Sequence, residues 1–134
     1  MNDPKTVKPT IEFDDFLKAD LRVGTIEKAE LHPNGDKLLV LTVDFGPLGK
    51  RTICAGIRQF YGSQEHELAL LVGVQAVFCI NLAPRKMRGI ESQGMILAAA
   101  NDDHTRLGIV VASPSVASGK PFDGQRFAGG EVVG

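Results

Sequence analysis

The strongest constraint on the fold is a short stretch that alternates between apolar and polar residues and lies between two turn signals. From Leu39 to Phe45 every second residue is apolar, which is the period of a β-strand with one buried face. The stretch PNGD, at residues 33–36, precedes it, and GPLG, at residues 46–49, follows it. Both stretches have the composition of tight turns. The sequence therefore predicts β-strands joined by tight turns in this part of the chain.

Strand-like runs recur on both sides of this stretch. The predicted strands cover, in order, residues 21–32, 37–45, 51–57, 74–82 and 95–101, and residues 106–113 are expected to add a further strand near one end of the molecule. Gly24 interrupts the first strand, which indicates a bulge or a sharp bend there. A short helix is expected within residues 63–73, with Ser63 as its N-cap and Gly73 as its stop.

The order of these elements, three strands, a short helix and two strands, is that of an OB-fold, a five-stranded Greek-key barrel. We therefore expect an all-β protein of this class with short terminal additions. Residues 1–10 are expected to form an N-terminal arm and residues 11–122 the domain, which begins with a short helix within residues 11–20. Residues 123–134 are rich in glycine and are expected to form a loose tail.

Composition and charge argue against several classes of protein. Hydrophobic residues make up 43% of the chain, which is too many for a disordered protein. No apolar run reaches the roughly 18 to 20 residues that a membrane helix needs, so no membrane association is expected. The N-terminus lacks the apolar segment of a signal peptide, which makes the cytoplasm the expected location. Because the formal net charge is −1, any contact with nucleic-acid phosphates requires a local cluster of cations.

Residues that commonly bind metals or act in catalysis are scattered along the chain. His32, His66 and His104 are far apart, without a second ligand at helical spacing, so no metal site is expected, and His32 is expected to be a turn or surface residue. Cys54 and Cys79 lie in apolar runs and are expected to be reduced, buried thiols. No serine or cysteine has both a suitable base and an orienting acid nearby in the sequence. We therefore expect neither catalysis nor a cofactor.

A cationic segment, Ala83–Gly94, is the strongest candidate for function. It contains Arg85, Lys86 and Arg88, and no acidic residue occurs from Gln75 to Ile90. We interpret the segment as a long polar loop after the predicted fourth strand. OB-folds bind nucleic acids through the loops that follow strands one and four. The alternative is a solvated charged loop without a ligand, which is what most such clusters are.

The loop after the predicted first strand supplies a further cation, Lys37, which an OB-fold would bring to the same end of the barrel. Arg51 would join it if its side chain points outward. The chain has one tyrosine and no tryptophan, whereas proteins that bind single strands commonly stack bases on aromatic rings. We therefore expect recognition of the backbone and shape of a folded RNA.

Four blocks of the sequence resemble the tRNA-binding domain family. They are FDDFLKADLRVG, HPNGDKLLVLTVDFG, CAGI and NLAPRKMRGIESQGMILAA, at residues 13–24, 32–46, 54–57 and 81–99. That family includes free-standing tRNA-binding proteins, the C-terminal domain of bacterial methionyl-tRNA synthetase and the CsaA-type chaperones. The resemblance implies an OB-fold, a homodimer and binding to the outer corner of folded tRNA without catalysis. It also implies action in trans with, or alongside, an aminoacyl-tRNA synthetase.

The resemblance further implies a set of tRNA-binding residues, which are Lys37, Asn81, Arg85, Lys86, Arg88, Ser92 and Met95. One position departs from the family, which often has alanine or serine where this chain has Gly35. That glycine loosens the loop beside Lys37 and leaves the lysine in place.

Two other functions stay open at this point. A CsaA-like, peptide-binding export chaperone would use the same barrel, and the methionines of the cationic segment and the negative net charge would permit it. A dimerisation domain without RNA affinity is the other. The homodimer itself is predicted because Phe13, Phe16 and Leu17 and the run at residues 106–113 lie outside the five-strand core. Both segments would expose apolar surface on a monomer.

Overall fold

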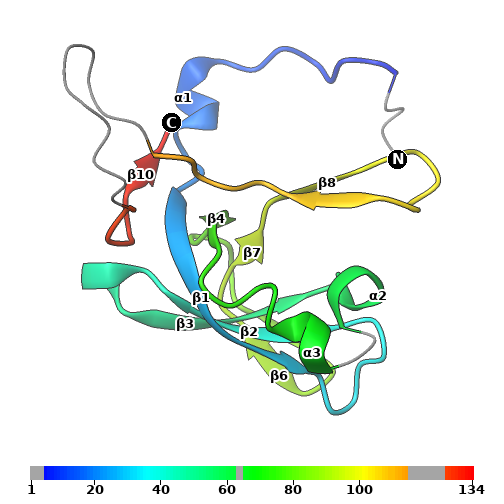
Figure 1. Ribbon diagram of the computed structural model, residues 1–134. Helices are drawn as coiled ribbons and strands as arrows, with labels where there is room; N and C mark the ends of the chain where they lie inside the picture. The colour runs from blue at the N-terminus through cyan, green and yellow to red at the C-terminus, as the bar shows by residue number, and fades with distance from the viewer. Residues whose placement is uncertain (1–4, 63–64, 115–125) are drawn as a thin grey trace.

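The computed structural model describes residues 5–62, 65–114 and 126–134, and its main feature is one curled antiparallel sheet of six strands (Figure 1). The strands run in the order β3-β2-β1-β4-β7, and β10 pairs with β1. Their bounds are Leu21–Leu31 for β1, Leu39–Asp44 for β2, Lys50–Ala55 for β3, Gln75–Cys79 for β4, Met95–Ile96 for β7 and Val132–Val133 for β10. The prediction of a mostly β, OB-like fold is confirmed, and the barrel takes the form of a curled, partly open sheet.

Two separate hairpins complete the β structure. They are β5 (Arg85–Met87) with β6 (Ile90–Ser92), and β8 (Ala98–Ala100) with β9 (Leu107–Ile109). The strand expected within residues 106–113 is β9.

The helices are short. They are α1 (Phe13–Phe16), the 3-10 turn η1 (Gly46–Leu48), α2 (Arg58–Tyr61) and α3 (Glu65–Leu68). The helix expected within residues 63–73 is α3, whereas the sequence does not predict α2. Gly73 has a φ of +88°, and its N–H donates to the Ile26 carbonyl over 2.7 Å, so it turns the chain into β4. The expected N-cap, Ser63, lies outside the described residues.

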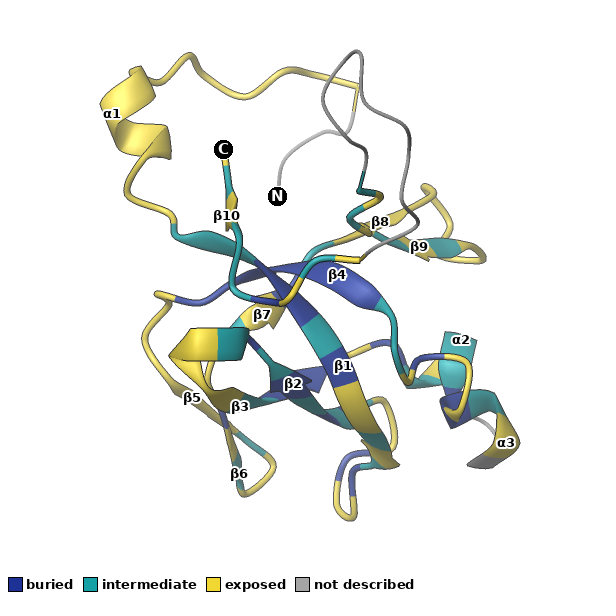
Figure 2. Ribbon diagram, turned by 60° about the vertical axis from the view of Figure 1, so that its left-hand side comes forward, coloured by how far each residue is buried: buried dark blue, intermediate teal, exposed yellow. Residues whose placement is uncertain are grey.

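The alternating stretch of β2 forms the centre of the core. Leu39, Leu41, Val43 and Phe45 are all fully buried, as the period of two predicts. Phe45 packs edge-to-face against Phe78 of β4, with ring centroids 5.3 Å apart, which is a favoured aromatic geometry. Every residue of β4 is buried (Figure 2). The core therefore lies between the two strands that flank β1 in the sheet.

β1 is long enough to serve both halves of the sheet, as expected of the first strand of a barrel. Its first half, Leu21–Thr25, pairs with β4, and its second half pairs with β2. The pairing with β2 is irregular between Ile26 and Lys28. The prediction of a bulge at Gly24 is therefore wrong, because Gly24 pairs in continuous register with Ala76 of β4.

Gly24 is required for a different reason, which is close packing. A Cβ atom at this position would lie 2.5 Å from Cγ1 of Val43 and 2.7 Å from Cε1 of Phe45. Both neighbours are fully buried, so neither has room to move. The glycine lets β1 cross directly over the core.

Side chains complete the closure of the barrel between β3 and the segment that follows β6. The Gln93 N–H donates to the Thr52 carbonyl over 2.9 Å, and the Thr52 N–H donates back to Oε1 of Gln93 over 3.0 Å. The Cys54 N–H donates to Oγ of Ser92 over 3.0 Å. Ser92 is buried and its hydroxyl donates in turn to the Gly94 carbonyl. We call these contacts the seam.

The C-terminal residues pack against β1, which corrects the expectation of a loose tail for residues 126–134. Besides the β10 pairing, the side-chain amide of Gln75 bonds to both backbone groups of Phe127. Gly129 and Gly130 have φ values of +112° and +87°, and a Cβ on Gly130 would lie 2.4 Å from the Phe45 carbonyl oxygen. The glycines here allow close packing instead of disorder. Residues 123–125 lie outside the described residues.

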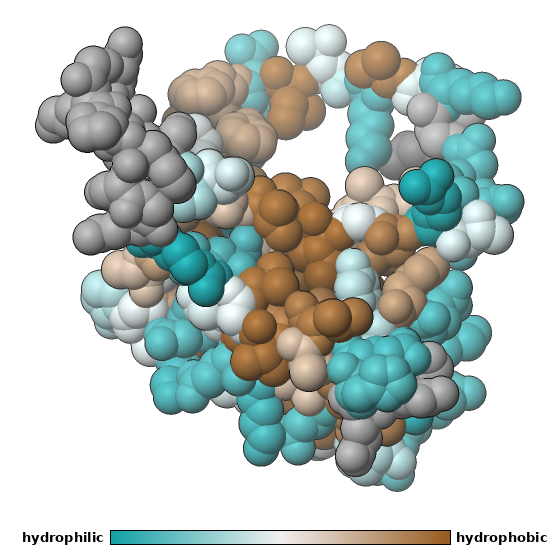
Figure 3. All heavy atoms as spheres, in the orientation of Figure 1, coloured by the Kyte–Doolittle hydropathy of each residue, from teal (hydrophilic) through white to brown (hydrophobic). Residues whose placement is uncertain are grey.

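The N-terminal segment stands apart from the sheet. Residues 5–12 are exposed and lead to α1, which lies beside the C-terminus at the upper left of Figure 1. Reciprocal bonds between Glu12 and Asp15 cap the helix, and the rings of Phe13 and Phe16 stack with centroids 6.4 Å apart. Phe13 is 69% exposed and Val7 is 93% exposed. Figure 3 shows apolar side chains along this segment at the top of the view, away from the main body of the molecule.

Candidate nucleic-acid interface

The cationic segment is a hairpin, not the long polar loop expected from the sequence. Arg85 pairs with Ser92, and Met87 pairs with Ile90, which leaves a two-residue turn. Arg88 and Gly89 form that turn with φ values of +50° and +94°. Positive φ at both positions is the signature of the type I′ turns that match the twist of a β-hairpin. This turn is difficult to predict from the sequence, because arginine seldom adopts positive φ.

The strand period separates the three cations of the hairpin. Arg85 and Met87 share one face of β5, where both line an apolar cavity of about 330 Å³ that also borders β3 and β7. Lys86 lies on the opposite face, across from Glu91. Arg88, at the tip, lines a second, polar cavity of about 490 Å³ together with residues 32–36. The cations therefore surround the hairpin and do not form one flat patch.

His32 joins the hairpin to the first loop, residues 32–38. It is only 2% exposed, so the expectation that His32 is a surface or turn residue is wrong about its exposure to solvent. The Asn34 N–H donates to Nδ1 of the imidazole over 3.0 Å, which leaves Nε2 to carry the proton and donate to the Met87 carbonyl over 2.9 Å. The neutral ring thereby fixes the loop and the hairpin relative to each other.

Arg58 lies between these two segments at the start of α2. One of its nitrogens, Nη1, donates to the Gly35 carbonyl over 3.0 Å. The Lys37 carbonyl accepts the Arg58 N–H at 3.5 Å, and the side chain of Lys37 is exposed. The structure thus brings Lys37 and Arg88 to one end of the barrel, as predicted, and adds Arg58, which sequence reasoning missed. Its only sequence signal was its position directly after the CAGI block.

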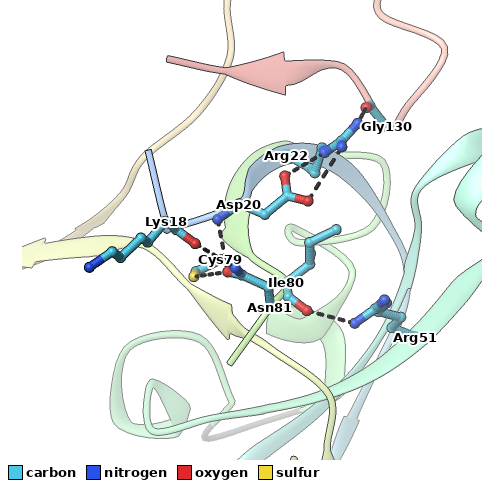
Figure 4. A network of polar contacts seen from close by, with 8 residues as sticks. All are labelled: Lys18, Asp20, Arg22, Arg51, Cys79, Ile80, Asn81 and Gly130. Carbon is cyan, nitrogen blue, oxygen red and sulfur yellow. Dashed lines mark hydrogen bonds and ion pairs between the residues drawn. The ribbon is translucent and has the colours of Figure 1, made fainter. Parts of the chain in front are cut away.

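Two residues of the expected set have structural partners. Ser92 is buried in the seam, where both its donor and its acceptor capacity are used. Asn81 holds the segment between α1 and β1: its amide accepts from the Asp20 N–H over 2.8 Å and donates to the Lys18 carbonyl over 2.6 Å (Figure 4). Met95 is 49% exposed and lines the apolar cavity beside Arg85.

Arg51 also has a structural role. Its guanidinium donates to the Ile80 carbonyl over 2.8 Å, as Figure 4 shows, and to the Gln93 carbonyl over 3.2 Å. The side chain therefore links β3 to the residues on either side of the hairpin. It supports the hairpin and is not presented outward.

Four cations at this end of the barrel have no partner of opposite charge, unlike the four cations elsewhere that form ion pairs. Within residues 5–62, 65–114 and 126–134, the side chains of Lys37, Arg85, Lys86 and Arg88 form no hydrogen bond or ion pair at all. Four ion pairs join other described residues: Lys18–Asp15, Arg22–Asp20, Lys28–Glu30 and Lys50–Glu27. The hydrogen bond from Lys50 to Glu27 raises the pKa of that lysine. Unpaired cations on a fixed hairpin are free to bind an external anion.

The described residues give little support for a metal site, a membrane-spanning helix or a reactive cysteine. They hold no group of three or more side chains suited to a metal ion, and none of their helices is long and apolar enough to cross a membrane. Cys54 and Cys79 are both buried and unbridged, as predicted. Burial raises the pKa of the Cys54 thiol, which keeps it protonated and unreactive at neutral pH.

Comparison with known proteins identifies relatives over most of the chain. The family model described as "Putative tRNA binding domain" matches residues 21–121. A methionine–tRNA ligase of Xylella fastidiosa (strain M23) is 48% identical over 119 residues, which are 89% of this chain and 16% of that protein. The chain thus spans about one sixth of the length of the curated ligase it matches.

Two solved structures share the fold over nearly their whole length. A MetRS-related protein from Pyrococcus horikoshii has a TM-score of 0.72 and 30% identity, with 94% of this chain and 99% of that chain covered. The chaperone CsaA from Bacillus anthracis has a TM-score of 0.70 and 26% identity, with 94% and 100% covered.

Proposed function

Since the chain belongs to the tRNA-binding domain family, we propose that it binds folded tRNA through the hairpin and the first loop, without catalysing a reaction. The observation that supports this most directly is the set of unpaired cations, Lys37, Arg85, Lys86 and Arg88, on two segments that His32 holds together. An anionic ligand would supply the partners that these side chains lack. Fixed positions reduce the entropy that binding costs.

The ligand is proposed to be recognised by its backbone and shape. Arginine presents a planar fork of donors that matches phosphate, and lysine presents a compact charge. Tyr61, the one tyrosine, is partly buried in α2, and the exposed Phe13 and Phe16 lie on α1 at the other side of the sheet (Figure 1). Phe60, also on α2, is partly buried as well, and neither the hairpin nor the first loop contains a phenylalanine, tyrosine or tryptophan. The outer corner of folded tRNA fits these properties, because it presents backbone phosphates on a convex surface.

The proposed context is the cytoplasm, in trans with or alongside an aminoacyl-tRNA synthetase. The similarity to methionine–tRNA ligases supports this context. A domain of this kind would raise the affinity of a synthetase for tRNA by adding a second contact to the same molecule.

A homodimer is proposed from the apolar surface that the chain leaves exposed. Ile11, Phe13, Phe16 and Leu17 project from the N-terminal segment, each between 43% and 69% exposed. A two-fold interface that buries this segment would remove it from water and would place two hairpins on one assembly. Light scattering at micromolar concentration tests this, and a monomer there would contradict the dimer.

The test of tRNA binding is a filter-binding titration of total tRNA at several salt concentrations. The variant carries Arg85→Ala and Arg88→Ala. The matched control carries Lys28→Ala and Lys50→Ala, which remove the same charge from ion-paired, exposed lysines. The first variant should bind about 100-fold more weakly, at roughly 1.5 kcal/mol for each lost charge-assisted contact. Its salt slope should fall by about 0.7 to 0.9 for each phosphate contact that is lost.

Two outcomes decide the proposal. The control should keep the affinity of the parent protein within about threefold, since its lysines are already neutralised by Glu30 and Glu27. A folded Arg85/Arg88 variant that binds tRNA like the parent, or a control that loses as much, removes the hairpin from the site.

The second candidate function is peptide binding, as in a CsaA-like chaperone. It is favoured by the fold shared with CsaA and by the apolar cavity, which Met87 and Met95 line with soft, adaptable surface. Competition between tRNA and an unfolded polypeptide separates the two functions. If the polypeptide binds more tightly than tRNA at low salt, the chaperone replaces the tRNA-binding function.

A further inference from the structure

The polar cavity between the first loop and the hairpin tip contains a second arginine beside Arg88. Its lining residues are His32, Pro33, Asn34, Gly35, Asp36, Arg58 and Arg88. Three separate segments of the chain meet there: the first loop, the start of α2 and the turn of the hairpin. They lie together at the lower right of Figure 1.

Arg58 is held in place with most of its donors unused. Nη1 donates to the Gly35 carbonyl over 3.0 Å and approaches the His32 carbonyl at 3.5 Å. Among the described residues no partner contacts its Nε or Nη2. An arginine anchored through one nitrogen presents the rest of its planar fork to a ligand, and such a fork binds two oxygens of a phosphate.

The opposite wall of the cavity is equally constrained. Arg88 occupies the first position of a two-residue turn at a φ of +50°, which restricts the direction in which its side chain leaves the backbone. The ring of His32 bonds to the Met87 carbonyl directly before it. The ring also accepts from the Asn34 N–H, so the two arginines lie on walls that are fixed to each other before any ligand binds.

The charges of the cavity suit a singly charged anion. Arg58 and Arg88 each contribute one positive charge, Asp36 contributes one negative charge, and His32 is neutral because its Nδ1 accepts a hydrogen bond. Within the described residues Asp36 forms no ion pair with either arginine. The cavity therefore keeps a net charge of about +1, which a phosphodiester, with its single negative charge, would neutralise.

We infer that this cavity is a phosphodiester-binding subsite, in which Arg58 and Arg88 contact the same backbone phosphate of the bound RNA. His32 acts as a positioning residue for both. The inference rests on the proposed tRNA-binding function and assigns a contact, Arg58, that lies outside the hairpin. It also makes the region where His32 connects the first loop to the hairpin part of the binding surface.

The test is a double-mutant cycle on tRNA binding with Arg58→Gln, Arg88→Gln and the two combined. Lys50→Gln, at the far end of β3, is the control of matched charge, and Arg85→Gln reports on the rest of the interface. Each single variant in the cavity should bind about tenfold more weakly, whereas Lys50→Gln should not change the affinity. Because the two arginines share one phosphate, the salt slope of the double variant should fall by about 0.7 to 0.9 in total.

Arg58→Lys is the control for a loss of binding that arises from unfolding, because lysine keeps the positive charge and a donor for the Gly35 carbonyl. It should keep the parent salt slope and bind tRNA more tightly than Arg58→Gln, and all variants should unfold cooperatively. If Arg85→Gln weakens binding while both Arg58 variants bind like the parent, the subsite is refuted and the tRNA-binding function stands. A double variant whose slope falls by about 1.4 to 1.8 refutes the shared phosphate. A parent protein that does not bind tRNA refutes both.

Discussion

His32→Phe is the most informative single change, because it keeps a ring of similar shape and removes both hydrogen bonds of the imidazole. The Met87 carbonyl and the Asn34 N–H would then lose their partner. A buried polar group without a partner costs about 1 to 3 kcal/mol, so the free energy of unfolding should fall by roughly 2 to 6 kcal/mol. That is a large part of the about 5 to 15 kcal/mol typical of a domain.

The protein has a local way to reduce this cost, which is to release the hairpin from the first loop and expose both groups to water. Urea unfolding measures the change in stability, and the tRNA titration measures the consequence for Arg88. If the hairpin separates, the loss of stability should lie near the lower limit, and tRNA should bind at least about tenfold more weakly, at 1.4 kcal/mol per factor of ten.

The control is His66→Phe, at an exposed position of α3, which should change the stability by no more than about 0.5 kcal/mol. A His32→Phe variant that is less than about 1 kcal/mol destabilised and that binds tRNA like the parent would refute the reasoning. His32 would then fill space without joining the loop to the hairpin.

Three further experiments test the fold around the site. Gly24→Ala should destabilise the protein by about 1 to 3 kcal/mol or more through overpacking in thermal unfolding, whereas Gly108→Ala, with open space around it, should be neutral. Ser92→Ala should cost about 1 to 3 kcal/mol by leaving the Cys54 N–H without its acceptor, and faster hydrogen exchange of that amide would show it. Because burial raises the pKa of the Cys54 thiol, iodoacetamide at pH 8 should alkylate the native protein slowly and the urea-unfolded protein fast. Equal rates would contradict the buried position.

The sequence predicts the strands well where one physical rule decides the outcome. The alternation at Leu39–Phe45 requires a buried face, and the turn compositions on either side determine where the strand ends. Glycine is harder to interpret, because it serves both flexible and tightly packed backbone. The sequence therefore indicates a bulge at Gly24 and a loose tail around residues 129 and 130, although each of these glycines allows a close approach to the core.

The candidate site is predicted in composition but not in geometry. Runs of cations are visible in the sequence, but their division between the faces of a hairpin depends on the turn at Arg88, whose conformation is unusual for arginine. Arg58 and His32 were missed because their roles arise from contacts between segments distant in the chain. Asn81 and Ser92 belong to a recognisable motif, yet their hydrogen bonds hold the fold together.

Within residues 85–93, the residues that close the barrel at the seam differ from the residues that carry the unpaired cations. Ser92 and Gln93 close the barrel through their own hydrogen bonds to β3, whereas the side chains of Arg85, Lys86 and Arg88 form no hydrogen bond or ion pair with the rest of the described protein. The hairpin can therefore exchange its outward side chains without opening the barrel. A library that varies only these three positions and keeps Ser92 and Gln93 should retain the scaffold while redirecting it to ligands of other charge.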